Sequence, residues 1–502
     1  MKESKHHSRR EFLKQLAFAG AGVVAAPSFL GALTEAPDSA KNASGKNTIS
    51  ETRPRPPGAK FVGELTTEPL ETVRVGLIGL GQRGFGFSPQ NASVPVERRG
   101  YWGLLGEILN VPFAQVVAVA DRDFSRAEEA VRIGSRIRPN LPAPGIYAGT
   151  ENAWKNLCER DDIDVVVVAT PWNLHVPMAL HAMNSGKHVF IEVPAAVSVD
   201  ECWALTDASE LTKRHCVILE NCCYGDEEMF VLNMVRHGVF GKLTHAECAY
   251  IHDLRAMLFR EGTEGDWRRE YHKSTDGNLY PTHGLGPVCR YFDVNRTDAL
   301  DVLVSMSSRE AGLSDFRTRG NAAGKRTPEK FSDEKYVCGD MNTTLIKTAL
   351  GRTILLRHDV VSPQPYSRVN MLTGTEATFS GYPPRLALDV PEKYDVSALP
   401  GGANAWLGER DFSKMRNMFR DPLWRVHGER MRRFGHGGMD AMMCFRLLDC
   451  IRQGITPDIT VYDAATWSSI VELSAHSVAN GSVPVKIPDF RRRGNTDALA
   501  KS

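Results

Sequence analysis

The sequence has no marked excess of either charge and few cysteines, and these absences exclude several kinds of protein. Its 61 lysine and arginine residues nearly balance its 60 aspartate and glutamate residues, so it offers neither the basic face of a nucleic-acid binder nor an acidic tail. Only 10 cysteines occur among 502 residues, without a disulfide framework or zinc-ligand spacing. We therefore expect buried free thiols, and we predict no metal site and no nucleic-acid partner.

Long apolar runs are also scarce. The one candidate, Leu16–Leu33, is interrupted by Gly20, Gly22 and Pro27, which argues against a membrane-spanning helix. Directly before it stands Ser8-Arg9-Arg10-Glu11-Phe12-Leu13-Lys14, and a twin arginine followed by a mild apolar run is typical of a Tat export signal. We expect a Tat leader over residues 1–40, passage through the Tat machinery to the periplasm or the medium, and no stable membrane anchor.

The composition and the predicted secondary structure of the remaining chain change twice. Residues 41–70 are polar and rich in proline, which indicates a linker. Residues 71–222 alternate strand and helix patterns, as in a Rossmann-type domain with a parallel sheet. Residues 223–490 predict a second α/β domain with a mostly antiparallel open sheet, whose final segment packs back on the first domain. The predicted fold class is therefore α/β.

Short apolar runs mark the expected strands of both domains. In the first domain they are Val73–Ile78, Gln115–Ala120, Asp164–Ala169, His188–Glu192 and His215–Leu219. In the second domain they are Thr244–Ile251, Ala299–Met306, Asn342–Leu350 and Thr353–His358, without regular helices between them. We expect a loop over residues 311–336, a solvated helix face at Glu227-Glu228 and a final helix over Ala464–Val478.

A glycine-rich turn follows the first strand directly. In Gly79-Leu80-Gly81-Gln82-Arg83-Gly84 the glycines permit a tight turn, close approach of a pyrophosphate and helix–strand packing. Asp121 ends the second strand, where a carboxylate accepts hydrogen bonds from ribose hydroxyls and repels a 2′-phosphate, which favours NAD. Arg122 follows it, and an arginine at this place can serve NADP. The long gap before Asp121 predicts an insertion around Phe87–Pro112, near the cofactor.

Two further strand ends predict ligand contacts at the same place. Thr170-Pro171-Trp172-Asn173-Leu174-His175 and Glu192-Val193-Pro194 each follow a strand of the first domain. Ligands of open parallel sheets bind at the carboxyl ends of the strands, so both segments should border the cofactor.

With these residues the chain resembles the Gfo/Idh/MocA oxidoreductase superfamily from Val73 to about Phe490. Most members carry a catalytic lysine where this chain has Val193, which argues against simple lysine-assisted dehydrogenation. Two long strings, Asn278–Pro287 (NLYPTHGLGP) and Gly435–Asp440 (GHGGMD), then sharpen the likeness. Together with the Tat leader they resemble glycoside hydrolase family 109, whose members are NAD-dependent α-N-acetylgalactosaminidases.

The resemblance implies two sets of site residues. Those expected to contact NAD, beside the glycines, are Gln82, Arg83, Asp121, Trp172, Asn173, Leu174, His175, Glu192, Val193 and Asn221. Those expected to contact the sugar are Tyr250, Arg268, Tyr280, Pro281, Thr282, His283 and Tyr366, with Tyr224 as a further neighbour. The resemblance also leaves open a homo-oligomer, since open sheet faces often pair subunits in this superfamily.

The chemistry implied by the family differs from ordinary glycoside hydrolysis, which uses two carboxylates across the bond. The sugar is oxidised at C3, loses its C2 proton and its C1 substituent, takes up water and is reduced again. Such a route needs proton acceptors and donors, a role suited to histidine and tyrosine. We expect His283, Tyr280 and Arg268 to be catalytic, with either His283 or Tyr280 as the C2 base and Arg268 steadying an enolate.

Two other functions fit the same sequence features. One is a periplasmic sugar oxidoreductase that holds NAD(P) tightly, since such relatives also use Tat export. The other is a non-catalytic protein that binds NAD or a sugar, because a fold does not fix a function.

Overall fold

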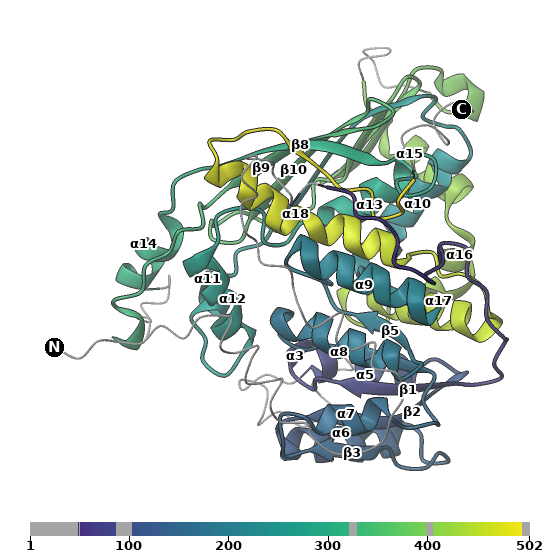
Figure 1. The fold of residues 1–502 in the computed structure, drawn as a ribbon. Helices are drawn as coiled ribbons and strands as arrows, with labels where there is room; N and C mark the ends of the chain where they lie inside the picture. Colours follow the sequence, from purple (N-terminus) through teal and green to yellow (C-terminus); the bar gives the residue numbers. More distant parts are fainter. Residues whose placement is uncertain (1–48, 50, 87–102, 321–328, 398–404, 494–502) are drawn as a thin grey trace. The chain divides into compact units, whose positions relative to one another are not determined.

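The computed structural model describes residues 49, 51–86, 103–320, 329–397 and 405–493 (Figure 1). The predicted leader and residues 87–102 of the predicted insertion lie outside the described residues. Within the described part, no helix is long and apolar enough to cross a membrane.

The first sheet has six parallel strands in the order β3-β2-β1-β4-β5-β6. They are β1 (Val73–Ile78), β2 (Ala114–Asp121), β3 (Gly145–Ala148), β4 (Val165–Val168), β5 (His188–Ile191) and β6 (Cys216–Ile218). Most of these strands are buried along their length, which explains their continuous apolar runs. The strand order reverses between β1 and β4, the position where open α/β sheets bind ligands. All five expected strands are confirmed. β3 escaped notice because it is short and only half-buried.

The described residues of this domain form six helices. They are α3 (Gln82–Phe85), α5 (Leu104–Leu109), α6 (Phe124–Ile137), α7 (Ala153–Cys158), α8 (Trp172–Asn184) and α9 (Val199–Thr212). Side-chain caps define where α6 and α9 begin: Asp123 accepts hydrogen bonds from the backbone of residues 125 and 126, and Ser198 accepts one from Glu201.

The second sheet has eight strands in the order β13-β12-β11-β7-β10-β9-β8-β14. They are β7 (Leu243–Ile251), β8 (Leu300–Ser307), β9 (Asn342–Thr348), β10 (Thr353–Asp359), β11 (Met371–Gly374), β12 (Ala377–Gly381), β13 (Pro384–Leu388) and β14 (Val485–Lys486). Only β7 and β10 pair in parallel, so the mostly antiparallel sheet is confirmed.

The expectation of no regular helices between the strands of the second domain is wrong for the segments between β7 and β8 and between β8 and β9. The helices before α18 are α10 (Asp226–Arg236), α11 (Arg255–Leu258), α12 (Glu264–Ser274), α13 (Thr282–Tyr291), α14 (Gly312–Arg319), α15 (Glu409–Phe419), α16 (Pro422–Met431) and α17 (Met439–Gln453). Helix α13 contains glycines and Pro287, which usually break helices. A Cβ on Gly284 would lie 2.7 Å from the backbone nitrogen of Ala249, so that glycine lets the helix pack closely on β7. The loop expected over residues 311–336 is likewise wrong where α14 forms.

The predicted final helix is confirmed as α18 (Val461–Ala479), which begins with a capping box between Thr460 and Asp463. It packs against α9 and β8, so it contacts a helix of the first domain and a strand of the second sheet (Figure 1). The expected buried free thiols are confirmed as well, since all ten cysteines are unpaired and buried.

Candidate active site

The glycine-rich turn after β1 has the geometry that a bound pyrophosphate requires. Gly79 has φ +94°, and a Cβ there would lie 2.4 Å from the carbonyl oxygen of Ala169. A Cβ on Gly84 would lie 1.8 Å from the carbonyl oxygen of Gly79, whereas a Cβ on Gly81 would meet nothing within 4 Å. Gly79 and Gly84 therefore allow the turn to pack, and Gly81 leaves its backbone open to a ligand.

The Asp121 carboxylate lies beside this turn, at the end of β2. Its Oδ2 accepts a hydrogen bond from the backbone nitrogen of Leu80 at 2.7 Å, and its Oδ1 accepts one from Asp123 at 2.9 Å. Each carboxylate oxygen keeps a second lone pair, so this held carboxylate can still accept ribose hydroxyls. The turn and Asp121 together fit NAD.

Four side chains form what we call the cofactor network: Arg83, Glu192, Asn221 and Asp440. Arg83 pairs through Nε with Glu192 at 2.5 Å and through Nη1 with Asp440 at 2.6 Å. The amide of Asn221 donates to Oδ1 of Asp440 at 2.5 Å. The network joins the glycine-rich turn, the loops after β5 and β6, and the first turn of α17.

Asp440 is the centre of this network and is almost fully buried. Burial alone would raise the pKa of its carboxyl group, but Arg83 and His436 hold that pKa well below its usual range. The half-exposed His436 donates from Nδ1 to Oδ2 of Asp440 at 2.8 Å. The GHGGMD string therefore supplies an ionised carboxylate to the cofactor side, with a histidine that supports it.

Two residues at the start of α8, Trp172 and His175, are held by hydrogen bonds to backbone oxygens. Trp172 donates from its indole nitrogen to the carbonyl of Val193 at 3.2 Å. Both ring nitrogens of His175 lie on backbone oxygens, at 2.8 Å from Pro194 and 2.7 Å from Thr170, and burial lowers the pKa of His175 to about 4. Trp172 and His175 thus hold the loops after β4 and β5 together.

Among the other residues expected at NAD, Gln82 and Asn173 have exposed side chains, and Leu174 is half-buried. They lie at the carboxyl ends of β1 and β4 and are available to a ligand there. Their contacts with NAD, like those of the residues above, stay predictions.

A second group, which we call the catalytic cluster, consists of Tyr250, Arg268, Tyr280 and His283. Tyr250 lies near the end of β7, Tyr280 precedes α13, and His283 lies in the first turn of α13. The ring centroids are 4.7 Å apart for Tyr250 and Tyr280, 5.2 Å for Tyr250 and His283, and 4.9 Å for Tyr280 and His283. The structure therefore brings together these residues from three separate segments.

Arg268, on α12, covers several of these rings. Its guanidinium carbon lies 5.3 Å from the ring centroid of Trp172 and 5.1 Å from that of Tyr280, and one of its nitrogens pairs with Glu264 at 2.7 Å. Burial raises the pKa of the Tyr280 phenol well above its ordinary value, although the charge of Arg268 opposes that shift. Tyr280 is therefore protonated near neutral pH, which suits a proton donor better than a base.

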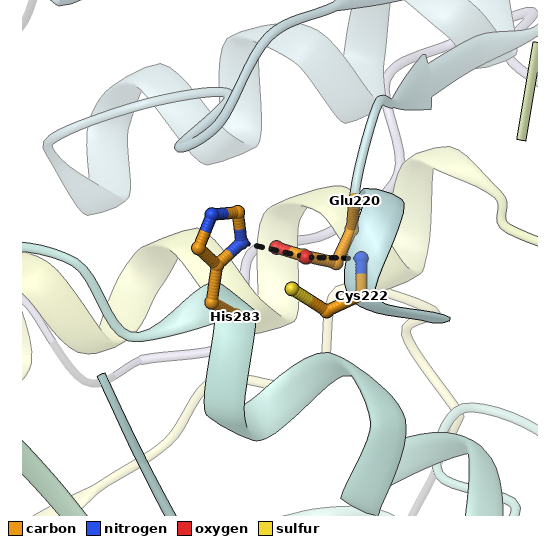
Figure 2. Close-up of side chains that lie close together, drawn as sticks. All are labelled: Glu220, Cys222 and His283. Atoms are coloured by element: carbon orange, nitrogen blue, oxygen red, sulfur yellow. Dashed lines mark hydrogen bonds and ion pairs between the residues drawn. The ribbon is translucent and has the colours of Figure 1, made fainter. Parts of the chain in front are cut away.

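His283 is paired with a buried carboxylate that sequence reasoning missed. Its Nδ1 donates to Oε1 of Glu220 at 2.7 Å, and the same oxygen accepts from the backbone nitrogen of Cys222 at 3.1 Å (Figure 2). Burial would raise the pKa of Glu220, but His283 lowers it overall. The second ring nitrogen of His283 points away from Glu220 (Figure 2), which leaves Nε2 free to act on a ligand.

The same close-up raises the question of a metal. Ligand atoms of Glu220, Cys222 and His283 lie within 4.8 Å of one another, the geometry of a group that could hold an ion. Burial raises the pKa of the Cys222 thiol well above its ordinary value, so the thiol is protonated. Oε1 of Glu220 already accepts from Nδ1 of His283 and from the backbone nitrogen of Cys222 without an ion, and the absence of a metal stays a prediction.

The remaining residues expected at the sugar separate into two groups. Pro281 and Thr282 are buried at the start of α13, and the ring of Tyr366 lies 6.4 Å from that of Tyr250, so these three adjoin the catalytic cluster. Tyr224 does not: it is fully buried, its ring lies 5.3 Å below Arg290, and its carbonyl accepts from Trp424.

Two further features were missed in the sequence. Glu220 stands directly after the strand that became β6, and a carboxylate at the carboxyl edge of a parallel sheet was the available signal. Glu228, expected on a solvated helix face, is instead buried against Arg368 with an Oε1 to Nη2 distance of 2.5 Å, because α10 packs that face inward. The solvated-face prediction is therefore wrong for Glu228.

Comparison with known proteins agrees with this geometry. Residues 73–220 match the oxidoreductase family with an NAD-binding Rossmann fold, and residues 224–496 match the C-terminal domain of glycosyl hydrolase 109. A glycosyl hydrolase family 109 protein of Solibacter usitatus is 44% identical over 439 residues, which cover 86% of this chain and 92% of that protein. One of Shewanella baltica is 39% identical over 486 residues, covering 96% of each. The chain belongs to glycosyl hydrolase family 109.

Solved structures place the fold among NAD-dependent oxidoreductases. A levoglucosan dehydrogenase in complex with NADH and L-sorbose has a TM-score of 0.56 at 18% identity, covering 84% of this chain and all (100%) of that one. An aldose-aldose oxidoreductase from Caulobacter crescentus has a TM-score of 0.53 at 15% identity, covering 83% and 100%. The family 109 chain is thus an NAD-dependent glycoside hydrolase on an oxidoreductase fold.

Proposed function

We propose that this enzyme hydrolyses terminal α-N-acetylgalactosaminides by oxidation at C3, elimination across C1 and C2, addition of water and reduction. The observation that carries the proposal is the Glu220–His283 pair at 2.7 Å, set against the protonated phenol of Tyr280. Tyr280 in turn lies 5.8 Å from the ring of Trp172, at the carboxyl edge of the Rossmann sheet. A proton acceptor, a proton donor and the cofactor side therefore adjoin one another.

NAD, when bound, supplies a hydride acceptor for C3 of the sugar and returns the hydride at the end of the cycle. A ketone at C3 makes the C2 proton acidic, because the resulting anion is an enolate. His283, oriented by Glu220, takes that proton at Nε2, while the cation of Arg268 stabilises the enolate oxygen. Tyr280 donates a proton toward the C1 oxygen as the bond to the aglycone breaks. Water then adds at C1 and gives up a proton that restores the Tyr280 phenol, while the proton held by His283 returns to C2. The proton that leaves O3 on oxidation passes to solvent and is taken up again on reduction.

We also propose that the enzyme is exported through the Tat system with NAD already bound. Retention is supported by the cofactor network, whose buried ion pairs join four segments around the glycine-rich turn. Replacing Arg9 and Arg10 with lysines should keep the protein in the cytoplasm, as judged by cell fractionation. Unchanged export would overturn this part of the proposal.

Turnover without added cofactor tests the hydrolase directly. Purified protein should release the aglycone from an aryl α-N-acetylgalactosaminide with no net NADH, because each cycle restores the oxidised cofactor. The second candidate, a sugar oxidoreductase, is favoured by the oxidoreductase neighbours of the fold. It would accumulate NADH with the sugar and release no aglycone, and that result would replace the proposed function.

A further inference from the structure

A pair of tyrosines extends the catalytic cluster toward solvent. Tyr366 is 41% exposed and Tyr382 is 38% exposed, whereas Tyr250 and Tyr280 are each 6% exposed. The ring of Tyr366 lies 6.4 Å from that of Tyr250 on one side and 6.4 Å from that of Tyr382 on the other. Aromatic rings therefore continue from His283 outward to the surface, and we call Tyr366 and Tyr382 the outer platform.

The topology of the second sheet explains why these residues meet. β10 pairs directly with β7 in parallel. β12 also runs in the direction of β7, because it is antiparallel to β11 and β11 is antiparallel to β7. The carboxyl ends of all three strands share one edge. Tyr250 lies near the end of β7, and Tyr382 lies in the two-residue turn between β12 and β13. Reaction centre and outer platform are thus on the same edge.

One buried arginine supports both rings of the outer platform. The guanidinium carbon of Arg368 lies 5.7 Å from the ring centroid of Tyr366 and 5.8 Å from that of Tyr382. Its Nη1 donates to the Tyr366 hydroxyl at 3.0 Å, and its Nη2 pairs with the buried Glu228. Because Glu228 neutralises Arg368, the platform presents aromatic faces and hydroxyl groups rather than an uncompensated charge.

The backbone beneath the platform is held in an unusual conformation. Val369 and Asn370 both lie in the left-handed region, with φ +61° and +48°, and a β-branched valine rarely adopts it. A Cβ on Gly381 would lie 2.9 Å from the Cβ of Asn370, so the β12–β13 turn packs tightly on this segment. Backbone strain of this kind concentrates at ligand sites, where the surrounding structure maintains it.

We propose that Tyr366 and Tyr382 bind the sugar residue to which the terminal N-acetylgalactosamine is attached. A pyranose presents a face of C–H groups and an edge of hydroxyls, which matches a tyrosine ring and its hydroxyl. A neutral ring also suits a platform whose arginine, Arg368, is already paired with Glu228. The preferred substrates are therefore glycans with a neutral pyranose at this position. This inference rests on the proposed function, since it extends the same site.

Direct binding separates the inference from the proposed function. Methyl β-galactopyranoside, added to the NAD-loaded protein with saturating N-acetylgalactosamine, should give saturation-transfer NMR signals from its C–H face. Tyr382→Ala should weaken this binding about tenfold, and Tyr382→Phe, which keeps the ring, should change it less than about twofold. Equal binding by the alanine variant would overturn the inference whether or not the protein hydrolyses glycosides. Thermal melting of both variants checks folding.

Kinetics then test the substrate class. We compare kcat/KM for an α-N-acetylgalactosaminyl-galactose disaccharide with that for methyl α-N-acetylgalactosaminide, since both leaving groups are alcohols. Tyr382→Ala should lower the ratio of these values about tenfold, because binding energy away from the reacting bond is lost. An unchanged ratio, or a loss seen only with a serine-linked glycopeptide, would overturn a sugar subsite. So would a Tyr382→Ala variant whose sole change is dissociation of a dimer.

Discussion

The cofactor network and the catalytic cluster are built from different groups. In the cofactor network, Arg83 is paired with two carboxylates, and Asp440 accepts from an arginine, a histidine and an amide. In the catalytic cluster, aromatic rings surround Arg268, which pairs with Glu264 at 2.7 Å, and His283 is bonded to Glu220 at 2.7 Å. One region uses its charges to fix protein segments, while the other keeps hydrogen-bonding atoms for a ligand.

This difference matches how long each ligand must stay. In the proposed cycle NAD remains bound through many turnovers, and directional ion pairs between four segments suit that task. A sugar has to enter, react and leave, and aromatic faces bind it without fixing a single pose. If the comparison is correct, changes in the catalytic cluster should affect turnover more than NAD retention, and changes in the cofactor network should do the reverse.

The largest effect is expected from His283→Ala. Removing the proposed base should lower kcat at least about 1,000-fold, within the range for general-base catalysis, while NAD stays bound. Bound NAD is measured from the absorbance of the denatured protein's supernatant, and kcat from aglycone release. His237→Ala, which changes the exposed histidine at the C-cap of α10, is the matched control. Near-normal turnover by His283→Ala would remove His283 from the mechanism.

Glu220→Gln should have the next largest effect. The amide oxygen can still accept from Nδ1 of His283, but the negative charge that stabilises the imidazolium formed during proton transfer is lost. We therefore expect kcat to fall about 10- to 100-fold while KM changes little, because Glu220 does not lie on the ligand side of His283. An unchanged kcat, with unchanged melting temperature, would show that Glu220 acts only structurally.

Asp440→Asn tests whether the cofactor network retains NAD. Arg83 loses a buried ionic partner, and such losses mainly raise dissociation rates, so NAD should leave at least about tenfold faster. The rate is followed by competition with excess labelled NAD. His436→Gln removes only the half-exposed partner of the same carboxylate and should give a smaller change. Equal NAD retention in Asp440→Asn and the unaltered protein would contradict a retaining network.

The smallest effect concerns stability and pH. The folded-state pKa of Asp440 lies well below the value of about 3.9 for an unfolded aspartate, so its stabilisation is fully present above that value. The stabilisation is lost as the pH falls toward the folded-state value. The difference in melting temperature between the unaltered protein and Asp440→Asn should therefore stay constant from about pH 7 to 5 and narrow below about pH 4. A gap that widens in acid would contradict the ionised carboxylate.

Much of the architecture follows from local sequence patterns. Buried parallel strands such as Val165–Val168 are continuous apolar runs, and the spacing of the glycines predicts the tight turn after β1. Helix α13 could not be predicted this way, since its glycines and proline resemble a loop until Gly284 is seen packed on β7. Tertiary contact decides such segments, and local pattern does not record it.

The candidate site shows the same division. Tyr280 and His283 could be predicted from the YPTH string, because both side chains can transfer protons and are close in sequence. Glu220 pairs with His283, 63 positions away, and Asp440 pairs with Arg83, 357 positions away, and only the folded sheet edges bring these residues together. Tyr382 was missed for the same reason, since nothing near it in the sequence marks it as a neighbour of Tyr366, which was predicted at the sugar.

The central claim is that hydrolysis passes through removal of the C2 proton while NAD stays resident. It is tested by incubating the NAD-loaded protein with an aryl α-N-acetylgalactosaminide in heavy water and examining the released sugar by NMR and mass spectrometry. We predict one deuterium at C2 of the N-acetylgalactosamine, without added cofactor. Release of a sugar that keeps its original C2 hydrogen would contradict the mechanism.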